Sequence, residues 1–306
     1  MRKNPLLIIL GPTASGKTKL AVELAAALGG EVISADSRQV YTGMDIGTGK
    51  DLNEYHYQGK EVPYHLIDIR KAGEQYNVNE FKDDFFEVYQ EISSRGNVPV
   101  LCGGTGMYIH SLLQKQDFTS VPVDKALRER LAHFDIQQLR QLLSDFPEEL
   151  VSHADHSSHK RLIRAMEIAE YLKDHTLETR ERPAFSPVVI GLTSTIEERR
   201  KRIARRLSSR LDSGLIAEVA NLLNDGIPRE TIEFYGLEYK FISLYLHNDL
   251  TLEELKDRLL IAINQFAKRQ MTFFRKMEKD GVKIHWYDIN EDREEIKNSI
   301  IKIIDL

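Results

Sequence analysis

About the first hundred residues alternate between short apolar runs and longer amphipathic segments. An uninterrupted apolar run of roughly four to eight residues indicates a buried strand, whereas apolar residues spaced three and four apart indicate a helix with one buried face. The expected strands span 6–10, 31–35, 64–69 and 98–102, and the expected helices span about 17–28 and 77–94. Because strands that alternate with helices are typical of a parallel sheet covered by helices, we predict an α/β fold.

The pattern changes between about 118 and 185, where helical periodicity continues without a strand signal. An apolar run at 188–192 then predicts another buried strand, and the chain beyond it is helical again until a short strand is expected at 285–287. A chain of 306 residues exceeds the usual size of one domain. We therefore expect an α/β core formed by 1–117 and 186–306, with an all-helical insertion domain at 118–185.

A glycine-rich segment directly follows the first expected strand and fits the pattern G-x-x-x-x-G-K-[ST]. Its eight residues are Gly11, Pro12, Thr13, Ala14, Ser15, Gly16, Lys17 and Thr18. Glycine lets such a loop curl until several backbone N–H groups point at one phosphate chain, and the following helix adds the positive end of its dipole. Lys17 adds a positive charge, and the Thr18 hydroxyl is suited to a magnesium ion shared with the phosphates. The segment predicts a pyrophosphate site but does not identify the molecule that carries the pyrophosphate.

Polar residues follow two other expected strands, at the end where ligands of parallel sheets bind. Asp36 and Ser37 come after strand 31–35, and Gly103-Gly104-Thr105 follows strand 98–102. We therefore expect both groups beside the phosphate-binding loop. Asp36 is a candidate general base for a substrate held there. A carboxylate that orients magnesium, or one that caps its own loop, would need the same placement, so the spacing leaves these roles open.

Composition is that of an ordinary soluble protein, with 42% hydrophobic and 29% charged residues and no apolar run of membrane-spanning length. Only a strand-length apolar segment precedes the phosphate-binding loop, so we expect no signal peptide and a cytoplasmic location. Cys102 is the single cysteine, which excludes an intramolecular disulfide and a multi-cysteine zinc site. Its place in an expected strand predicts a packing role.

Basic residues are concentrated locally, although the net charge is −5. One expected helix carries a run without an acid: Arg199, Arg200, Lys201, Arg202, Arg205, Arg206 and Arg210. A second cluster consists of Lys160, Arg161 and Arg164. A solvated helix face is the ordinary explanation for such runs, but the missing acids in the first cluster favour a polyanion such as a phosphate backbone.

Two other segments have less specific patterns. Aromatic and basic residues are mixed in 266–275, which fits either nucleobase stacking or core packing with exposed bases. His153, His156 and His159 are spaced like metal ligands, but only Asp155 lies close enough to assist them. We expect these histidines to face the surface or an RNA.

Taken in order, these residues resemble those of the tRNA dimethylallyltransferase family, also called tRNA isopentenyltransferases, over nearly the whole chain. The shared segments are 11–18, 33–37 with Tyr41, 43–48, 65–70, 103–105 with Tyr108, 161–167 and 267–270. A phosphate-binding loop alone is shared by many kinases, whereas this ordered set is specific. The resemblance implies a P-loop NTPase-like parallel sheet core that carries a helical insertion, and the insertion would grip the anticodon stem-loop of a tRNA.

The resemblance also implies an activity, namely the transfer of a dimethylallyl group from dimethylallyl diphosphate to N6 of adenosine 37. The substrates would be tRNAs that read codons beginning with U, with Mg²⁺ as the cofactor, no membrane and no obligate protein partner. Asp36 would accept the proton or a hydrogen bond of the adenine amine, Thr13 and Arg206 would flank the bridging oxygen of the diphosphate, and Thr18 would help to hold Mg²⁺. The implied tRNA contacts are Asp36, Ser37, Arg38, Gln39, Thr105, Arg128, Lys160, Arg161, Leu162, Ile163 and Arg164.

Three other activities use a similar loop. A small-molecule kinase would place the γ-phosphate of ATP there and use Asp36 to activate an acceptor hydroxyl. An isopentenyltransferase that acts on a free adenine nucleotide would need neither the insertion nor its bases. An RNA-binding nucleotide switch would bind its nucleotide without catalysing a reaction. The placement of Asp36 and Thr105 disfavours this activity. The chain also departs from the family pattern in two places. Ser157-Ser158 stands where the family usually has an Asn-Asp pair, and Leu237-Glu238 stands where the family has an aromatic and a basic residue.

Overall fold

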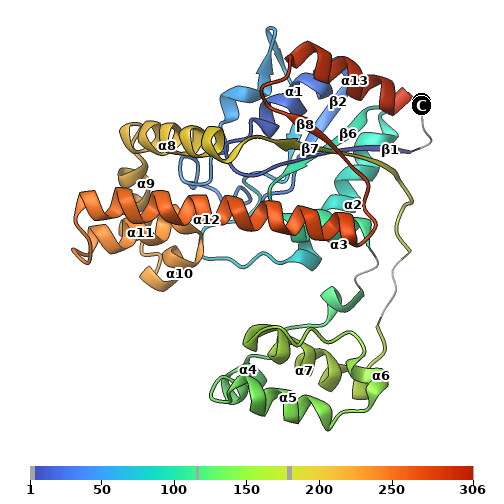
Figure 1. Ribbon diagram of the computed structural model, residues 1–306, viewed down its shortest axis with the longest axis vertical. Coiled ribbons are helices and arrows are strands. Elements are labelled where there is room, and N and C mark those ends of the chain that lie inside the picture. The colour runs from blue at the N-terminus through green and yellow to red at the C-terminus, as the bar shows by residue number, and fades with distance from the viewer. Residues whose placement is uncertain (1–3, 115–116, 178–180, 306) are drawn as a thin grey trace. The chain divides into compact units, whose positions relative to one another are not determined.

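The computed structural model describes residues 4–114, 117–177 and 181–305 and divides the chain into two compact units (Figure 1). Unit 1 combines 1–113 with 183–306, and unit 2 is the intervening segment 114–182.

Unit 1 is built on a six-stranded parallel sheet with the order β5-β2-β6-β1-β7-β8. Its strands are β1 (Pro5–Leu10), β2 (Gly30–Ser34), β5 (Tyr64–His65), β6 (Val98–Gly103), β7 (Ser186–Thr193) and β8 (Ile284–Asp288). The predicted α/β fold with a parallel sheet is confirmed. Leu10 lies opposite Gly103 and Gly191, so the segments that follow β1, β6 and β7 begin near the same edge of the sheet. A separate antiparallel hairpin pairs β3 (His56–Tyr57) with β4 (Lys60–Glu61).

The prediction of a strand over 64–69 was wrong beyond residue 65. Leu66 and Asp68 have φ angles of 60° and 57°, a left-handed backbone that cannot continue a β-ladder. Leu66 and Ile67 are nonetheless buried, each in a different hydrophobic cluster. The apolar run that indicated a strand therefore reflects packing on both sides of an irregular segment.

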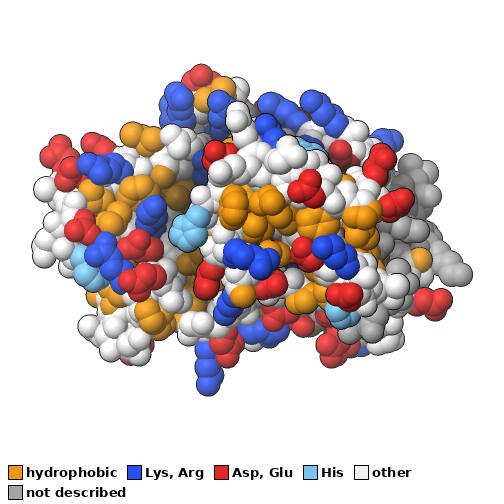
Figure 2. All heavy atoms as spheres, turned by 90° about the horizontal axis from the view of Figure 1, so that it is seen from below, with side chains coloured by type: hydrophobic (Ala, Val, Ile, Leu, Met, Phe, Trp, Pro, Cys, Tyr) orange, Lys and Arg blue, Asp and Glu red, His pale blue; other side chains and the backbone are white. Residues whose placement is uncertain are grey.

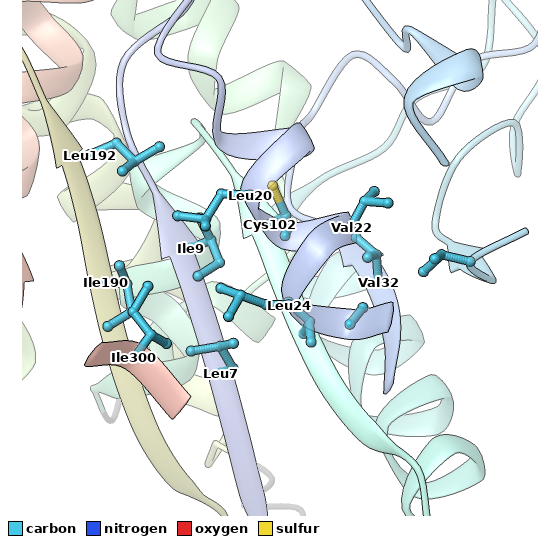
Figure 3. Close-up of a cluster of buried hydrophobic side chains, with 14 of the residues drawn as sticks. Leu7, Ile9, Leu20, Val22, Leu24, Val32, Cys102, Ile190, Leu192 and Ile300 are labelled. Carbon is cyan, nitrogen blue, oxygen red and sulfur yellow. The ribbon is translucent and has the colours of Figure 1, made fainter. Parts of the chain in front are cut away.

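Hydrophobic clusters cover both faces of the sheet. On one face, Leu20 and Leu24 of α1 (Lys17–Leu28) and Ile300 of α13 (Arg293–Asp305) belong to the same cluster as Leu7 and Ile9 of β1 (Figure 3). The opposite cluster is formed with α2 (Val78–Ser94), α3 (Gly106–Leu113) and α12 (Leu252–Lys279), and its aromatic members include Phe81, Phe85, Tyr108 and Phe274.

The two helices that were predicted in this part of the chain have clear end signals. Gly16 and Gly29 flank α1 with φ angles of 79° and 62°, a conformation that glycine adopts without the penalty of a Cβ. Asn77 caps α2, accepting from the backbone N–H of Glu80 while the Glu80 carboxylate accepts from that of Asn77. This reciprocal capping box explains why the helix begins at Val78.

A third hydrophobic cluster joins the loop after β2 to a group of helices. The helices are α8 (Ile196–Asp212), α9 (Leu215–Asn224), α10 (Arg229–Phe234), α11 (Leu237–Leu246) and α12. Val40, Tyr41 and Met44 are at most 1% exposed and pack among them. The packing holds the loop in place on the helical part of unit 1.

Unit 2 is helical throughout its described regular structure. Its elements are η2 (Asp117–Ser120), α4 (Lys125–Leu131), α5 (Ile136–Ser144), α6 (Glu148–Val151) and α7 (His159–Asp174). These helices enclose a small core of their own that includes Leu139, Leu143 and Leu162.

Acidic and basic side chains are intermixed on the face drawn in Figure 2, with hydrophobic side chains between them. No single sign of charge dominates that face. Among the helices of the described ranges, none has the length and apolar character needed to cross a membrane.

Candidate active site

The phosphate-binding loop lies between β1 and α1 and contains a buried hydroxyl without a partner. Ser15 is 6% exposed, and its Oγ makes no hydrogen bond within the described structure. A buried hydroxyl in this state costs free energy that a ligand would recover by accepting a hydrogen bond from it. Ala14 and Gly16 have positive φ angles of 62° and 79°, which give the loop its curl.

The surroundings of Lys17 disfavour its positive charge. Loss of contact with water lowers the pKa of its ammonium, and nearby Arg206 lowers it further, against the opposing effects of Cys102 and Asp36. A bound anion would reverse this shift by favouring the charged lysine. Beside it, burial raises the pKa of the Cys102 thiol to about 12, so this free cysteine is protonated at neutral pH and serves in packing.

Gln270 ties the phosphate-binding loop to the glycines after β6. Its Oε1 accepts from the Thr13 backbone N–H at 2.9 Å, and its Nε2 donates to the Gly104 carbonyl at 3.0 Å. Gly104 has no room for a side chain, because a Cβ there would lie 2.5 Å from Nε2. The sequence offered no signal for this role, since Thr13 and Gln270 are 257 residues apart.

Asp36 leaves β2 beside Thr105, as predicted from the strand ends. The Ser37 N–H donates to Thr105 Oγ1 at 3.1 Å, which joins the two loops. One Asp36 oxygen accepts from the Arg38 N–H at 2.9 Å, a turn that caps its own loop. The second oxygen accepts no hydrogen bond within the described structure, so it remains available as a base.

Arginines of α8 lie against the glycine-rich loop that follows Met44. Arg206 Nη2 donates to Asp51 at 2.6 Å, and Arg210 Nη1 donates to the Gly47 carbonyl at 3.3 Å. Gly49, at φ 64°, lies beneath both guanidinium groups, and a Cβ on it would collide with them.

Arg210 is more deeply buried than its neighbour and lacks one partner. Its side chain is 12% exposed, it pairs with Glu238 at 3.5 Å, and its Nη2 makes no hydrogen bond in the part of the chain that the structure describes. Burial and Arg206 lower its pKa. Glu238, one of the departures from the family pattern, thus supplies partial compensation for two arginines.

Glu218 fixes the same loop from α9. Its carboxylate accepts from the backbone N–H groups of Asp45, Ile46 and Gly47 at 2.7–2.9 Å and from the Tyr239 hydroxyl at 2.7 Å. A carboxylate with four donors is fully engaged in positioning the loop.

These segments line one cavity of about 1070 Å³, which is large enough for a diphosphate and a purine. It is bordered by the phosphate-binding loop, the loop after β2, and helices α8, α11 and α12. The predicted site residues that line it are Thr13, Ala14, Gly16, Lys17, Thr18, Asp36, Ser37, Arg38, Gln39, Thr105 and Arg206. Its further polar lining includes Asp51 and Glu54, which sequence reasoning missed. It also includes Arg210, Glu238 and Gln270, which the sequence analysis named without assigning them to this site.

Gly11, Pro12 and Ser15 belong to the phosphate-binding loop but do not line the cavity. The other predicted residues lie in unit 2, and the structure gives them different surroundings. Leu162 and Ile163 are 0% and 7% exposed, so their side chains belong to the core of that unit. Arg128 and Arg164 are engaged with Glu167 at 2.7–3.1 Å. Lys160 and Arg161 are exposed.

Of the three spaced histidines of unit 2, His156 is exposed as expected, whereas His153 and His159 are packed within the unit. Among the described residues, no group of three or more His, Cys, Asp or Glu could hold a metal ion. His153 packs against Phe118, with 4.4 Å between ring centroids and 32° between ring planes, and His159 is bonded to the Phe134 carbonyl at 2.8 Å. Both therefore belong to the packing of unit 2.

Comparison with known proteins identifies the family. The model of the "IPP transferase" family matches residues 39–277, and that of "Isopentenyl transferase" matches residues 4–69. A tRNA dimethylallyltransferase 1 of Parabacteroides distasonis is 47% identical over 304 residues, 99% of each chain. A tRNA dimethylallyltransferase 1 of Geotalea daltonii is 50% identical over 283 residues, 92% of this chain and 90% of that one.

Solved structures agree. The full-length tRNA isopentenylpyrophosphate transferase of Bacillus halodurans superposes with a TM-score of 0.72 at 35% identity, covering 99% of this chain and 97% of that one. A tRNA isopentenylpyrophosphate transferase of Staphylococcus epidermidis gives a TM-score of 0.71 at 30% identity, covering 99% of each chain. The chain is therefore a member of the IPP transferase family, with the P-loop-like fold of the tRNA isopentenyltransferases.

Proposed function

We propose that this protein transfers a dimethylallyl group from dimethylallyl diphosphate to N6 of adenosine 37, in tRNAs that read codons beginning with U, and releases diphosphate. The observation that carries the proposal is the single cavity in which Asp36 and the phosphate-binding loop meet the arginines of α8. A cytoplasmic location is part of the same proposal, since its substrates are found there.

In the proposed reaction, N6 of the adenine attacks C1 of the dimethylallyl group while the bond from C1 to the bridging oxygen breaks. The bonding electrons leave with the diphosphate, and the proton of the amine passes to the free oxygen of Asp36. Lys17, Arg206 and the loop N–H groups stabilise the charge that gathers on the leaving group. The placement of Lys17 in the cavity lining and its lowered pKa support an anion at this position.

Magnesium suits the donors at this site. Mg²⁺ prefers oxygen ligands and is commonly held by one or two protein groups together with substrate phosphates, so the lack of a three-residue cluster among the described residues fits this mode. The Thr18 hydroxyl, which lines the cavity, would hold the ion together with oxygens of the substrate diphosphate. When bound, the ion would neutralise part of the charge of the diphosphate.

We assign tRNA contacts to two places. Ser37, Arg38, Gln39 and Thr105 line the cavity around Asp36, where the extruded adenosine would enter. In unit 2, exposed Lys160 and Arg161 are suited to the phosphates of the anticodon stem.

The alternative activities differ from the proposed one in the parts of the molecule that they require. A kinase or a transferase acting on free nucleotides would engage the phosphate-binding loop but would not require the second basic cluster. One assay separates them: labelled dimethylallyl diphosphate is incubated with tRNA, with AMP, or with ATP and small acceptors. Label in tRNA, recovered as dimethylallyladenosine by mass spectrometry, supports the proposal, whereas label in AMP or phosphorylation of an acceptor refutes it.

The role of Asp36 is tested by Asp36→Ala, which we expect to lower turnover by roughly two to four orders of magnitude because the general base is lost. Binding of tRNA should be largely preserved. Asp225→Ala, at an exposed aspartate that does not line the cavity, is the control for loss of one carboxylate. Near-normal turnover of the Asp36 variant would remove its proposed role.

A further inference from the structure

Two phenylalanines are prominent among the exposed hydrophobic side chains that the structure describes. Phe234 is 68% exposed and Phe266 is 41% exposed. Each ring has an arginine guanidinium above it: Arg38 lies 5.0 Å from the ring centroid of Phe234, and Arg269 lies 6.0 Å from that of Phe266. An exposed aromatic ring paired with a guanidinium is a surface on which a flat ligand can stack.

Both pairs border the cavity. Phe266, Arg38 and Arg269 line it directly. Phe234 is the last residue of α10, between Glu233 and Tyr235, and both of these neighbours line the cavity. The Arg38 backbone N–H donates a hydrogen bond to Asp36, so the arginine that pairs with Phe234 also contacts the proposed base.

The position of Phe234 is fixed although its ring is exposed. Tyr235, the next residue, is 1% exposed and belongs to the third hydrophobic cluster, as does Ile232 two residues earlier. Phe234 itself is not a member of that cluster. The core therefore anchors the end of α10 while the aromatic ring at this end points to solvent.

We propose that Phe234, with Arg38 above it, stacks on the unpaired nucleobase next to the target adenosine, an inference that rests on the proposed function. A purine extruded from an RNA loop leaves its neighbouring bases with an exposed face, which costs stacking energy. Unpaired RNA bases recover this energy by stacking on aromatic rings and guanidinium planes. Because the pair adjoins Asp36, a base that it holds is adjacent in sequence to the base that reacts.

The test measures dissociation constants of labelled anticodon stem-loops, by fluorescence anisotropy, for the wild type, Phe234→Ala and Phe234→Trp. The RNAs are the intact loop and two loops with an abasic nucleotide at position 36 or at position 38. We expect Phe234→Ala to weaken binding of the intact loop about ten-fold, the order of one base–aromatic stack, and Phe234→Trp to restore it. When the abasic nucleotide replaces the base that Phe234 holds, Phe234→Ala should bind that loop as tightly as the wild type does.

The abasic loop that the wild type and Phe234→Ala bind equally well therefore identifies the neighbouring base that Phe234 holds. On the other abasic loop, Phe234→Ala should still bind about ten-fold more weakly than the wild type. Ile196→Ala is the control, since Ile196 is 53% exposed and does not line the cavity. Turnover at saturating stem-loop should be unchanged in Phe234→Ala, because Asp36 is intact. An equal loss on all three RNAs, or no loss on the intact one, overturns the proposal.

Anisotropy requires no transfer of the dimethylallyl group. If Phe234→Ala weakens binding of the stem-loop as expected but the wild type forms no dimethylallyladenosine, the proposed function is contradicted and the stacking site stands. If the wild type transfers the dimethylallyl group but Phe234→Ala binds the stem-loop equally well, the stacking site is contradicted and the proposed function stands.

Discussion

The two basic clusters of the molecule differ in what neutralises them. In unit 2, Arg128 and Arg164 share Glu167, whose side chain is 1% exposed, and Arg164 also donates to the carbonyls of Pro122, Phe118 and Val121. In α8, Arg210 keeps a buried Nη2 without a partner in the described structure, and Arg206 pairs with an Asp51 that is itself 44% exposed.

The comparison separates structural arginines from those suited to a ligand. Arg164 has its donors satisfied inside the protein, so its contribution is to stability. The α8 arginines face a cavity with donors to spare, so an anion that enters can replace their incomplete partners. The supply of internal partners, rather than the density of positive charge, distinguishes the two.

The largest effect expected within these two clusters is on catalysis, in Arg206→Ala. Loss of a positioned donor to the departing diphosphate should lower turnover roughly 10²- to 10³-fold, with little change in melting temperature. Arg206→Lys should recover part of the rate, because it restores the charge but not the planar fork. Arg200→Ala is the matched control, since Arg200 is exposed on the same helix and does not line the cavity. Equal rates for Arg206→Ala and Arg200→Ala would abolish the distinction drawn for α8.

The second effect is on stability, in Glu167→Gln. This substitution leaves Arg128 and Arg164 without their buried carboxylate and should lower the free energy of unfolding by about 3 kcal/mol. Glu170→Gln is the control on the same helix, because its ion pair with Lys173 is 42–45% exposed and is expected to contribute less than about 1 kcal/mol. Urea denaturation of the full chain measures both, and a Glu167 variant as stable as the Glu170 variant would show that the buried network is not structural.

The sequence predicted those parts of the molecule that depend on local signals. The helices at 17–28 and 77–94 were predicted from the spacing of apolar residues, a local pattern, and the structure shows that glycines and a capping box mark their ends. The phosphate-binding loop was found because its pattern is contiguous. Asp36 and Thr105 were placed together because parallel strands bring their carboxyl ends to one edge of the sheet.

Partners from distant segments could not be predicted. Gln270 reaches Thr13 across 257 residues, and Glu218 reaches Asp45 across 173, and no pattern in either segment announces the other. The role of Arg164 is an intermediate case. Glu167 stands three residues later on the same helix, so the possibility of an internal ion pair was visible, but its burial was not.

The smallest expected effect concerns the part of the second cluster that stays exposed. Arg161 has a 60% exposed side chain and pairs at 2.8 Å with Asp155, which is 50% exposed, so it can exchange that partner for a phosphate at little cost. If it contacts the anticodon stem, Arg161→Ala should reduce the slope of log K against log salt by up to about 0.9, the value for one phosphate contact on a duplex. Lys302→Ala, which removes one exposed positive charge from α13, should leave the slope nearly unchanged because general electrostatics alone are altered. Stem-loop affinities over a series of KCl concentrations provide the measurement. Equal slopes for the two variants would mean that unit 2 binds no phosphate through Arg161, and the contrast would then lie between a ligand-binding cluster and one that is wholly structural.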